Sequence, residues 1–412
     1  MGTALATKGD AMNVKRRTVL AGSLALAGLP SLAQQKQYSP GASDTEIKIG
    51  NTTPYSGPAS AFGIVGRAQA AYFKMINERG GIGGRKVTYI TLDDGYSPPK
   101  TVEMVRKLVE EEEVLFTVAT LGTASNSAIH KYMNQKKVPH LFVSSGATKW
   151  NDPKNFPWTM GFNPNYQSEG KLYAQDILRT RPTAKVAVLY QNDDYGKDLL
   201  KGLMDGLGDK AKDLIVKTAS YEVTDPTADS QIVSLQASGA DVFVDVTTPK
   251  FAAQAIRKVA DIGWKPVHYL NNVGSSIGAV LKPAGLDKSV GLITMLYIKP
   301  VTDPKWADDK AVQEYFAFMK KYMPNDDPSE GGASTGLAIA QLTGHLLAKC
   351  GDNLTRDNVM KQAANLKYQI PMALPGVVAE TSPTDYALFK TIQLARFDGS
   401  AWMLSGEPVA IQ

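Results

Sequence analysis

Apolar positions along the chain alternate between strand-like and helix-like spacing. Short apolar runs at 47–49, 86–92 and 114–119 predict strands, and apolar residues recur at helical spacing between them, as at 64–76. Strands that alternate with helices favour a parallel sheet with helices on both faces. The first part of the chain therefore predicts an α/β layer.

The same alternation begins again after a loop-like stretch, 148–165. Further strands are predicted at 185–190, 215–221, 241–246, 267–270 and 391–397. Two such runs predict two lobes of similar build. The expected fold class is α/β, with two doubly wound parallel-sheet lobes.

Polar loops follow the predicted strands in both halves. In open parallel sheets, ligands bind at the carboxyl ends of the strands, beside helix N-termini that favour anions. Ser, Thr and Asn are also common cap and turn residues, but six such loops on two facing lobes favour a cleft between them. The candidate ligand-binding residues in these loops are Tyr55, Gly122, Thr123, Ser145, Gly146, Ala147, Thr148, Tyr195, Thr247, Thr248, Asn271 and Asn272.

The N-terminal segment has the order of a secretory signal. Lys15, Arg16 and Arg17 precede the apolar run 18–29, and small residues follow up to Ala33. Residues 1–33 are therefore expected to be a signal peptide, and the mature protein is expected in the periplasm. Arg16-Arg17 also fits the twin-arginine pattern, so both export routes stay open. No later apolar run reaches the ~18 residues of a membrane span.

The composition of the chain limits the kinds of partner and cofactor that we expect. The 412 residues carry 45 basic and 40 acidic side chains, a net charge of +5 of which part lies in residues 1–33. A nearly neutral remainder argues against a nucleic-acid partner. The single cysteine, Cys350, excludes an internal disulfide, and the four histidines lack metal-site spacing. We expect a monomer with no cofactor, metal or catalytic residue.

One motif favours an enzyme. Gly274-Ser275-Ser276-Ile277-Gly278 matches the nucleophile elbow of serine hydrolases. A hydrolase also needs a base, and the only downstream histidine, His345, lies in an apolar helical stretch. A binding protein is therefore favoured, and a hydrolase is kept as an alternative.

Several stretches resemble one family. These are Pro-Tyr-Ser-Gly-Pro-Ala at 54–59, Ile-Asn-Glu-Arg-Gly-Gly-Ile-Gly-Gly-Arg at 76–85, and Asp194-Tyr195-Gly196. From about Asp44 onward the chain resembles the type I periplasmic binding proteins of the branched-chain amino acid ABC-transporter class. The resemblance implies two lobes joined by three crossovers. Lobe 1 would comprise 44–161 and 297–372, and lobe 2 would comprise 162–296 and 373–412.

The resemblance also implies a function and roles for residues. Such a protein delivers a small ligand to the membrane permease of an ABC transporter. The ligand carboxylate would be held by Thr123 and by the loop of Gly146 and Thr148. A ring from Tyr55 or Phe62 would shield the ligand, and Tyr195 would close over it. A sensor module of the same fold is a second alternative, although the missing membrane anchor favours a carrier.

One loop departs from the family pattern. The family's amino acid binders use an acidic residue after the strand that matches 267–270, whereas this chain has Asn271 and Asn272 there. We therefore expect an organic acid without an α-amino group, aromatic acids first. A branched-chain amino acid remains the alternative if Asp193, Asp194 or Asp245 reaches the cleft.

Overall fold

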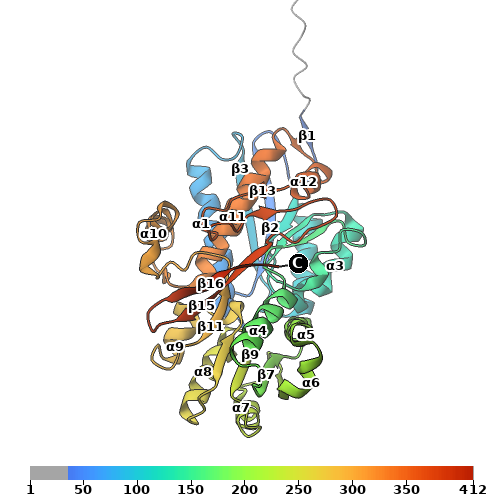
Figure 1. Cartoon of the computed structure of the whole chain (residues 1–412). Helices are drawn as coiled ribbons and strands as arrows, with labels where there is room; N and C mark the ends of the chain where they lie inside the picture. Colours follow the sequence, from blue (N-terminus) through green and yellow to red (C-terminus); the bar gives the residue numbers. More distant parts are fainter. Residues whose placement is uncertain (1–35, 412) are drawn as a thin grey trace, which may run out of the picture. The chain divides into compact units, whose positions relative to one another are not determined.

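The computed structural model describes residues 36–411 (Figure 1). The predicted signal peptide, residues 1–33, lies outside the described residues. Two main sheets and the helices that pack on them build residues 36–411, as the alternating pattern predicts. Within residues 36–411, no helix is both long and apolar enough to cross a membrane.

The first sheet has five parallel strands in the order β3-β2-β4-β5-β6. Its strands are β2 (Glu46–Thr53), β3 (Lys86–Asp93), β4 (Phe116–Val118), β5 (His140–Val143) and β6 (Thr159–Gly161). Strand β6 lies in the stretch that we expected to be only a connecting loop, so that expectation is wrong. Three residues are too short to show a period in the sequence, and β6 forms because it pairs with β5.

The second sheet has seven strands in the order β16-β15-β11-β10-β9-β7-β8. Its strands are β7 (Val186–Gln191), β8 (Ile215–Tyr221), β9 (Val242–Val246), β10 (Val267–Leu270), β11 (Ile293–Leu296), β15 (Thr391–Phe397) and β16 (Trp402–Ala410). β7 to β11 are parallel, but β15 and β16 are antiparallel, so this sheet is mixed. The reason is a hairpin, in which the Asp398 carboxylate accepts hydrogen bonds from the N–H groups of Ser400 and Ala401.

Helices cover both faces of each sheet. The longer helices are α1 (Gly63–Glu78), α2 (Pro98–Arg106), α3 (Thr123–Lys136), α4 (Tyr166–Thr180), α5 (Asp194–Leu207), α7 (Asp229–Gln236), α8 (Pro249–Asp261), α10 (Lys310–Tyr322), α11 (Gly331–Cys350) and α12 (Arg356–Ala363). α1 packs on α11, α2 on α3, and α4 on α5. The α4–α5 contact depends on Gly202, where an added Cβ would lie 2.2 Å from the carbonyl oxygen of Gln167.

Short elements complete the chain. They are β1 (Gln37–Tyr38), β12 (Asn353–Leu354), β13 (Lys367–Tyr368), β14 (Ala379–Glu380), α6 (Ala211–Leu214), α9 (Lys282–Ala284), the 3-10 turns η1 (Ser60–Phe62), η3 (Thr148–Trp150), η4 (Gly208–Lys210), η5 (Asn272–Gly274) and η7 (Pro304–Trp306), and the π-helical turns η2 (Lys107–Glu111) and η6 (Ile277–Leu281). Strands β5 and β9 are buried along their whole length. Helices on both faces of a parallel sheet explain these nearly continuous apolar runs.

Candidate ligand-binding site

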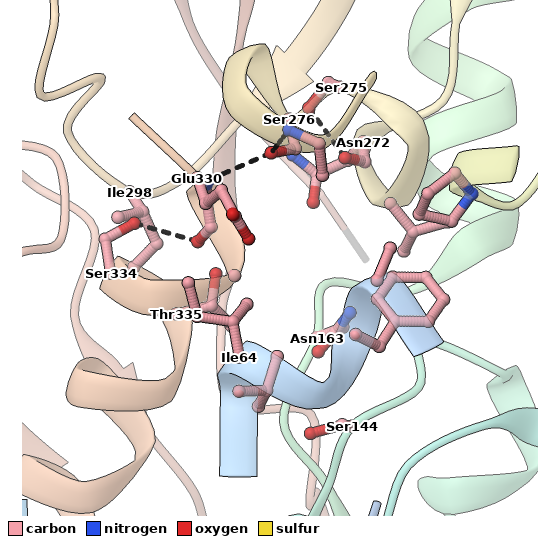
Figure 2. A pocket seen from close by; sticks show the side chains of 18 of the residues that line it. Ile64, Ser144, Asn163, Asn272, Ser275, Ser276, Ile298, Glu330, Ser334 and Thr335 are labelled. Atoms are coloured by element: carbon pink, nitrogen blue, oxygen red, sulfur yellow. Dashed lines mark hydrogen bonds between the residues drawn. The ribbon is translucent and has the colours of Figure 1, made fainter. Parts of the chain in front are cut away.

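A cavity of about 160 Å³ lies between segments that follow strands of the two sheets. Its volume is close to that of an apolar protein cavity that accommodates one benzene ring. The lining residues used below are Phe62, Ile64, Tyr96, Gly122, Thr123, Ser144, Asn163, Tyr166, Tyr195, Thr248, Asn272, Ser275, Ser276, Ile277, Tyr297, Lys299, Glu330, Gly332 and Trp402. Figure 2 shows Asn272, Ser275 and Ser276 on one side of the pocket and Ser144 on the other.

The first side, which we call the α3 wall, consists of residues 121–123 and Ser144. Helix α3 begins at Thr123, and its N-cap is Gly122 with φ 99°. No side chain caps this helix, so its first N–H groups lack partners within the helix. Gly122 is required here because an added Cβ would lie 2.5 Å from the ring of Tyr96. The α3 wall therefore presents N–H groups and the positive end of a helix dipole, which suit an anion.

Hydroxyl and amide groups surround the N-terminus of α3. The Thr123 and Ser145 hydroxyls share a hydrogen bond of 2.7 Å, and the Trp150 indole N–H donates to Ser145 Oγ at 2.9 Å. Ser144 Oγ and Asn163 Oδ1 are buried and have no hydrogen-bond partner in the part of the chain that the structure describes, although both residues line the cavity. Because buried polar atoms are almost always paired, these two atoms are suited to a ligand.

A neutral network lies behind the α3 wall. His140 Nε2 is 2.7 Å from Thr120 Oγ1 and 2.8 Å from Asn126 Oδ1. Burial lowers the pKa of His140 to about 3, so the ring is uncharged near neutral pH. The attraction of the α3 wall for an anion therefore comes from N–H groups and hydroxyls, not from a positive side chain.

The opposite side, the η5 wall, consists of residues 272–277. The Asn272 N–H donates to Glu169 Oε1 at 2.7 Å, and the Tyr173 hydroxyl donates to the same oxygen at 2.7 Å. Burial raises the pKa of Glu169 to about 7. The η5 wall is thus backed by a buried carboxyl group, in contrast to the α3 wall.

Aromatic side chains form much of the remaining surface. The rings of Tyr166 and Tyr195 meet edge to face with centroids 5.1 Å apart, and Tyr96 and Phe62 lie nearby in the lining. Burial raises the pKa of both Tyr166 and Tyr195, so their hydroxyls keep their protons. Trp402, from the antiparallel strand β16, donates its indole N–H to the carbonyl oxygen of Ser275 at 2.8 Å. These rings can cover an apolar or aromatic ligand body.

Two charged side chains line the cavity. Lys299 is neutralised by Asp309, with Nζ 2.7 Å from the carboxylate. The second, Glu330, is partly buried, and burial raises its pKa. Glu330 is therefore the acidic side chain of the cavity lining.

A scan with family models matches residues 46–399 to the periplasmic binding protein family. The chain belongs to this family. Among curated relatives, the leucine-specific-binding protein of Salmonella typhimurium is 28% identical over 200 residues, which are 48% of this chain and 50% of that protein. Leu/Ile/Val-binding protein homolog 1 of Brucella abortus is 26% identical over 287 residues, 68% of this chain and 73% of that protein. The chain thus spans about half the length of the Salmonella relative.

Solved structures share the fold of this periplasmic binding protein. A branched-chain amino acid ABC transporter protein from Thermus thermophilus with bound valine has a TM-score of 0.80 at 15% identity and covers 90% of this chain and 98% of its own. A solute-binding protein of an ABC transporter from R. palustris, in complex with 4-hydroxybenzoate, has a TM-score of 0.75 at 14% identity and covers 89% and 98%. The two-sheet fold is therefore typical of the family.

The predicted site residues fall into two groups in this periplasmic binding protein. Phe62, Gly122, Thr123, Tyr195, Thr248 and Asn272 line the cavity. The other predicted residues lie outside this lining. Ser145, Gly146 and Ala147 line a second cavity of only about 20 Å³, and Asn271 donates from Nδ2 to the Tyr195 hydroxyl.

The remaining three residues are bound to neighbours. The Tyr55 hydroxyl is 2.7 Å from Thr91 Oγ1, and the Tyr55 backbone N–H donates to Asp93. Thr148 donates from its N–H and its hydroxyl to Asp198, and Thr247 donates to Asp245.

The acidic residues that we kept open as ammonium partners do not line this cavity. Asp193 caps α5 by accepting from the N–H groups of Tyr195 and Gly196, and Asp194 pairs with Lys149 at 2.5 Å. Asp245 accepts from the Thr247 hydroxyl and lies 3.2 Å from His268 Nε2. The carboxylate that does line the cavity, Glu330, was missed by the sequence reasoning.

The sequence reasoning also missed other residues that line the cavity. Tyr96 follows the Asp93-Asp94-Gly95 strand end, which was a usable signal, but Asn163 and Tyr297, which follow strands β6 and β11, carry no motif. Ser276, from the hydrolase-like motif, accepts hydrogen bonds at Oγ from the N–H groups of Ala279 and Gly331. It therefore acts as a helix cap. Within residues 36–411, no cluster of three metal-ligating side chains is present.

Proposed function

We propose that this periplasmic binding protein carries a small organic carboxylate through the periplasm to the permease of an ABC transporter. The single observation that carries the proposal is the uncapped N-terminus of α3, with the unpartnered Ser144 Oγ beside it, in a cavity between the two sheets. A ligand carboxylate satisfies both the N–H groups and the hydroxyl. One relative is named as a leucine-specific-binding protein and another as a homolog of a Leu/Ile/Val-binding protein, which supports a carboxylate-bearing ligand.

The favoured ligand is an aromatic acid rather than an α-amino acid. An α-ammonium group would lie next to the ligand carboxylate, at the α3 wall, where the lining has no carboxylate. Leaving that ammonium unpaired in a closed site costs several kcal/mol. The tyrosine rings and the ring-sized volume suit an aromatic body.

The proposed mechanism is closure without catalysis. Residues 44–161 with 297–372 and residues 162–296 with 373–412 form the two lobes of the proposal, and the ligand draws them together by binding both. Ser276 has no role as a nucleophile in this proposal, because both of its Oγ contacts are with backbone N–H groups. The chain acts as a monomer without a cofactor.

A thermal-shift screen tests this function. We expect benzoate or 4-hydroxybenzoate at 100 times its dissociation constant to stabilise the protein by ~2.7 kcal/mol, which raises Tm by a few degrees. X-ray scattering should show a smaller radius of gyration with ligand. If leucine or valine raises Tm and the aromatic acids do not, the amino acid alternative replaces this ligand class.

A further inference from the structure

Glu330 lies across the cavity from Ser144. Figure 2 shows Glu330 in the upper part of the pocket and Ser144 in the lower part, with Asn163 at a level between them. Glu330 is the residue before helix α11, and it belongs to a loop that contacts the η5 wall. A ligand whose carboxylate binds the α3 wall therefore extends its far end toward Glu330.

Close backbone contacts hold Glu330 in this place. The Gly278 N–H donates to the Ser329 carbonyl oxygen at 3.3 Å, and the Gly331 N–H donates to Ser276 Oγ at 3.3 Å. An added Cβ at Gly278 would lie 2.6 Å from Cγ of Glu330, and one at Gly332 would lie 2.6 Å from Cγ2 of Ile64. The loop that carries Glu330 is thus held by close packing on both sides.

Among the described residues, the Glu330 carboxylate has no ion-pair partner of its own. The neighbouring cations are already paired, Arg67 with Asp326 at 2.6 Å and Lys282 with Asp327 at 2.6 Å. Within residues 36–411, no ion pair or side-chain hydrogen bond engages the Glu330 carboxylate. Three acids in this loop face two cations, and the acid left without an ion pair of its own is the one in the cavity lining.

We propose that Glu330 determines specificity by accepting a hydrogen bond from a donor at the far end of the ligand, a hydroxyl or an ammonium group. This inference rests on the proposed function, because the carboxylate at the α3 wall sets which end of the ligand reaches Glu330. The same negative charge repels a second carboxylate at that end. The ligand class becomes an aromatic acid with a para donor.

Four probes differ only at the para position: benzoate, 4-hydroxybenzoate, 4-(aminomethyl)benzoate and terephthalate. Calorimetric titration of the wild-type chain should show at least one donor-bearing acid binding tighter than benzoate, by on the order of tenfold or more. Terephthalate should bind more weakly than benzoate. The two donor probes show whether a hydroxyl or an ammonium group is preferred.

In Glu330→Gln, the affinity gained by 4-(aminomethyl)benzoate over benzoate should fall by about tenfold. The affinity for terephthalate should rise, and the affinity for benzoate should change little. Glu330→Asp, which keeps the charge, should retain the rejection of terephthalate and serves if the Gln variant folds poorly. Glu314→Gln, an exposed change of the same type on α10, is the control and should alter no affinity. Equal affinities for all four probes in the wild type, or a preference that survives in both Glu330 variants, overturn this inference alone. If none of the four binds, the proposed aromatic acid ligand fails with it.

Discussion

The α3 wall and the η5 wall line the same cavity, but the groups behind them differ in charge and in hydrogen bonding. Behind the α3 wall, His140, Asn126 and Thr120 form a neutral network, and the first N–H groups of α3 stay free. Behind the η5 wall, the buried Glu169 already takes the N–H of Asn272. The difference supports the proposal that a ligand anion binds at the α3 wall, where backbone N–H donors have no partner within the helix. The other end is left to neutral or donor groups.

Breaking the α3 wall should have the largest effect. Gly122→Ala places a Cβ 2.5 Å from the Tyr96 ring and also strains a residue at φ 99°. We expect loss of binding by more than about 100-fold and a fall in unfolding free energy of about 2–4 kcal/mol. Titration of 4-hydroxybenzoate and chemical denaturation measure these changes.

Gly263→Ala is the matched control for this change. Gly263 also has a positive φ of 65°, but no atom lies within 4 Å of an added Cβ. It should lose only about 1–2 kcal/mol of stability and keep its ligand affinity. Wild-type affinity in Gly122→Ala would show that the α3 wall does not hold the ligand.

The charge behind the η5 wall should appear in the pH dependence of stability. Burial raises the pKa of Glu169 from 4.5 to about 7, so the folded protein binds this proton more tightly than the unfolded chain. The free energy of unfolding therefore falls as pH rises from about 4.5 to about 7. The full loss, on the order of 3 kcal/mol, is present above about pH 8.

Glu169→Gln should remove this loss of stability, because a glutamine side chain does not titrate. Its amide oxygen can still accept the hydrogen bonds from Asn272 and Tyr173, so the η5 wall keeps its contacts. Relative to the wild type, the unfolding free energy of this variant should rise by about 3 kcal/mol between pH 4.5 and 8. The buried histidines are common to both proteins and cancel in this difference. A difference that stays constant with pH contradicts the raised pKa.

The contributions of the Thr123 and Thr148 hydroxyls to ligand binding, which the family resemblance predicts for both, can be measured separately. Thr123→Val keeps the shape but removes the hydroxyl beside the helix N-terminus, and we expect about tenfold weaker binding of aromatic acids. Thr148→Val should change affinity by less than about twofold, because Thr148 is bound to Asp198 outside the cavity lining. Equal losses in both variants would place Thr148 in the bound-state site as well.

The smallest effect on binding is expected from the ion pair between Lys282 and the loop that carries Glu330. Lys282 Nζ bonds Asp327 at 2.6 Å and Ser329 Oγ at 2.9 Å, and the proposed lobe boundaries place Lys282 and Asp327 in different lobes. The pair is well exposed, so its contribution is within about 1 kcal/mol. Lys282→Met should weaken binding a few-fold at low salt and not at high salt. Lys310→Met, which breaks only a helix-surface pair, should have no effect at either salt.

The sequence by itself determined the layers and one wall of the cavity. Alternating strand and helix periods predict the two sheets, since local spacing decides which face of an element is apolar. Gly122 and Thr123 were predictable because a parallel strand that enters a helix places that helix N-terminus at the sheet edge. The hairpin of β15 and β16 was only partly visible, as the predicted strand 391–397.

Only the tertiary structure decided which polar side chains face the cavity. Tyr55 and Thr148 looked as suitable as Thr123, but Thr91 and Asp198, distant in the sequence, engage them instead. Glu330 carries no motif, and it reaches the cavity because its loop packs between Gly278 and the α1 side chain of Ile64. Such choices depend on contacts between residues far apart in the chain, and no local pattern records them.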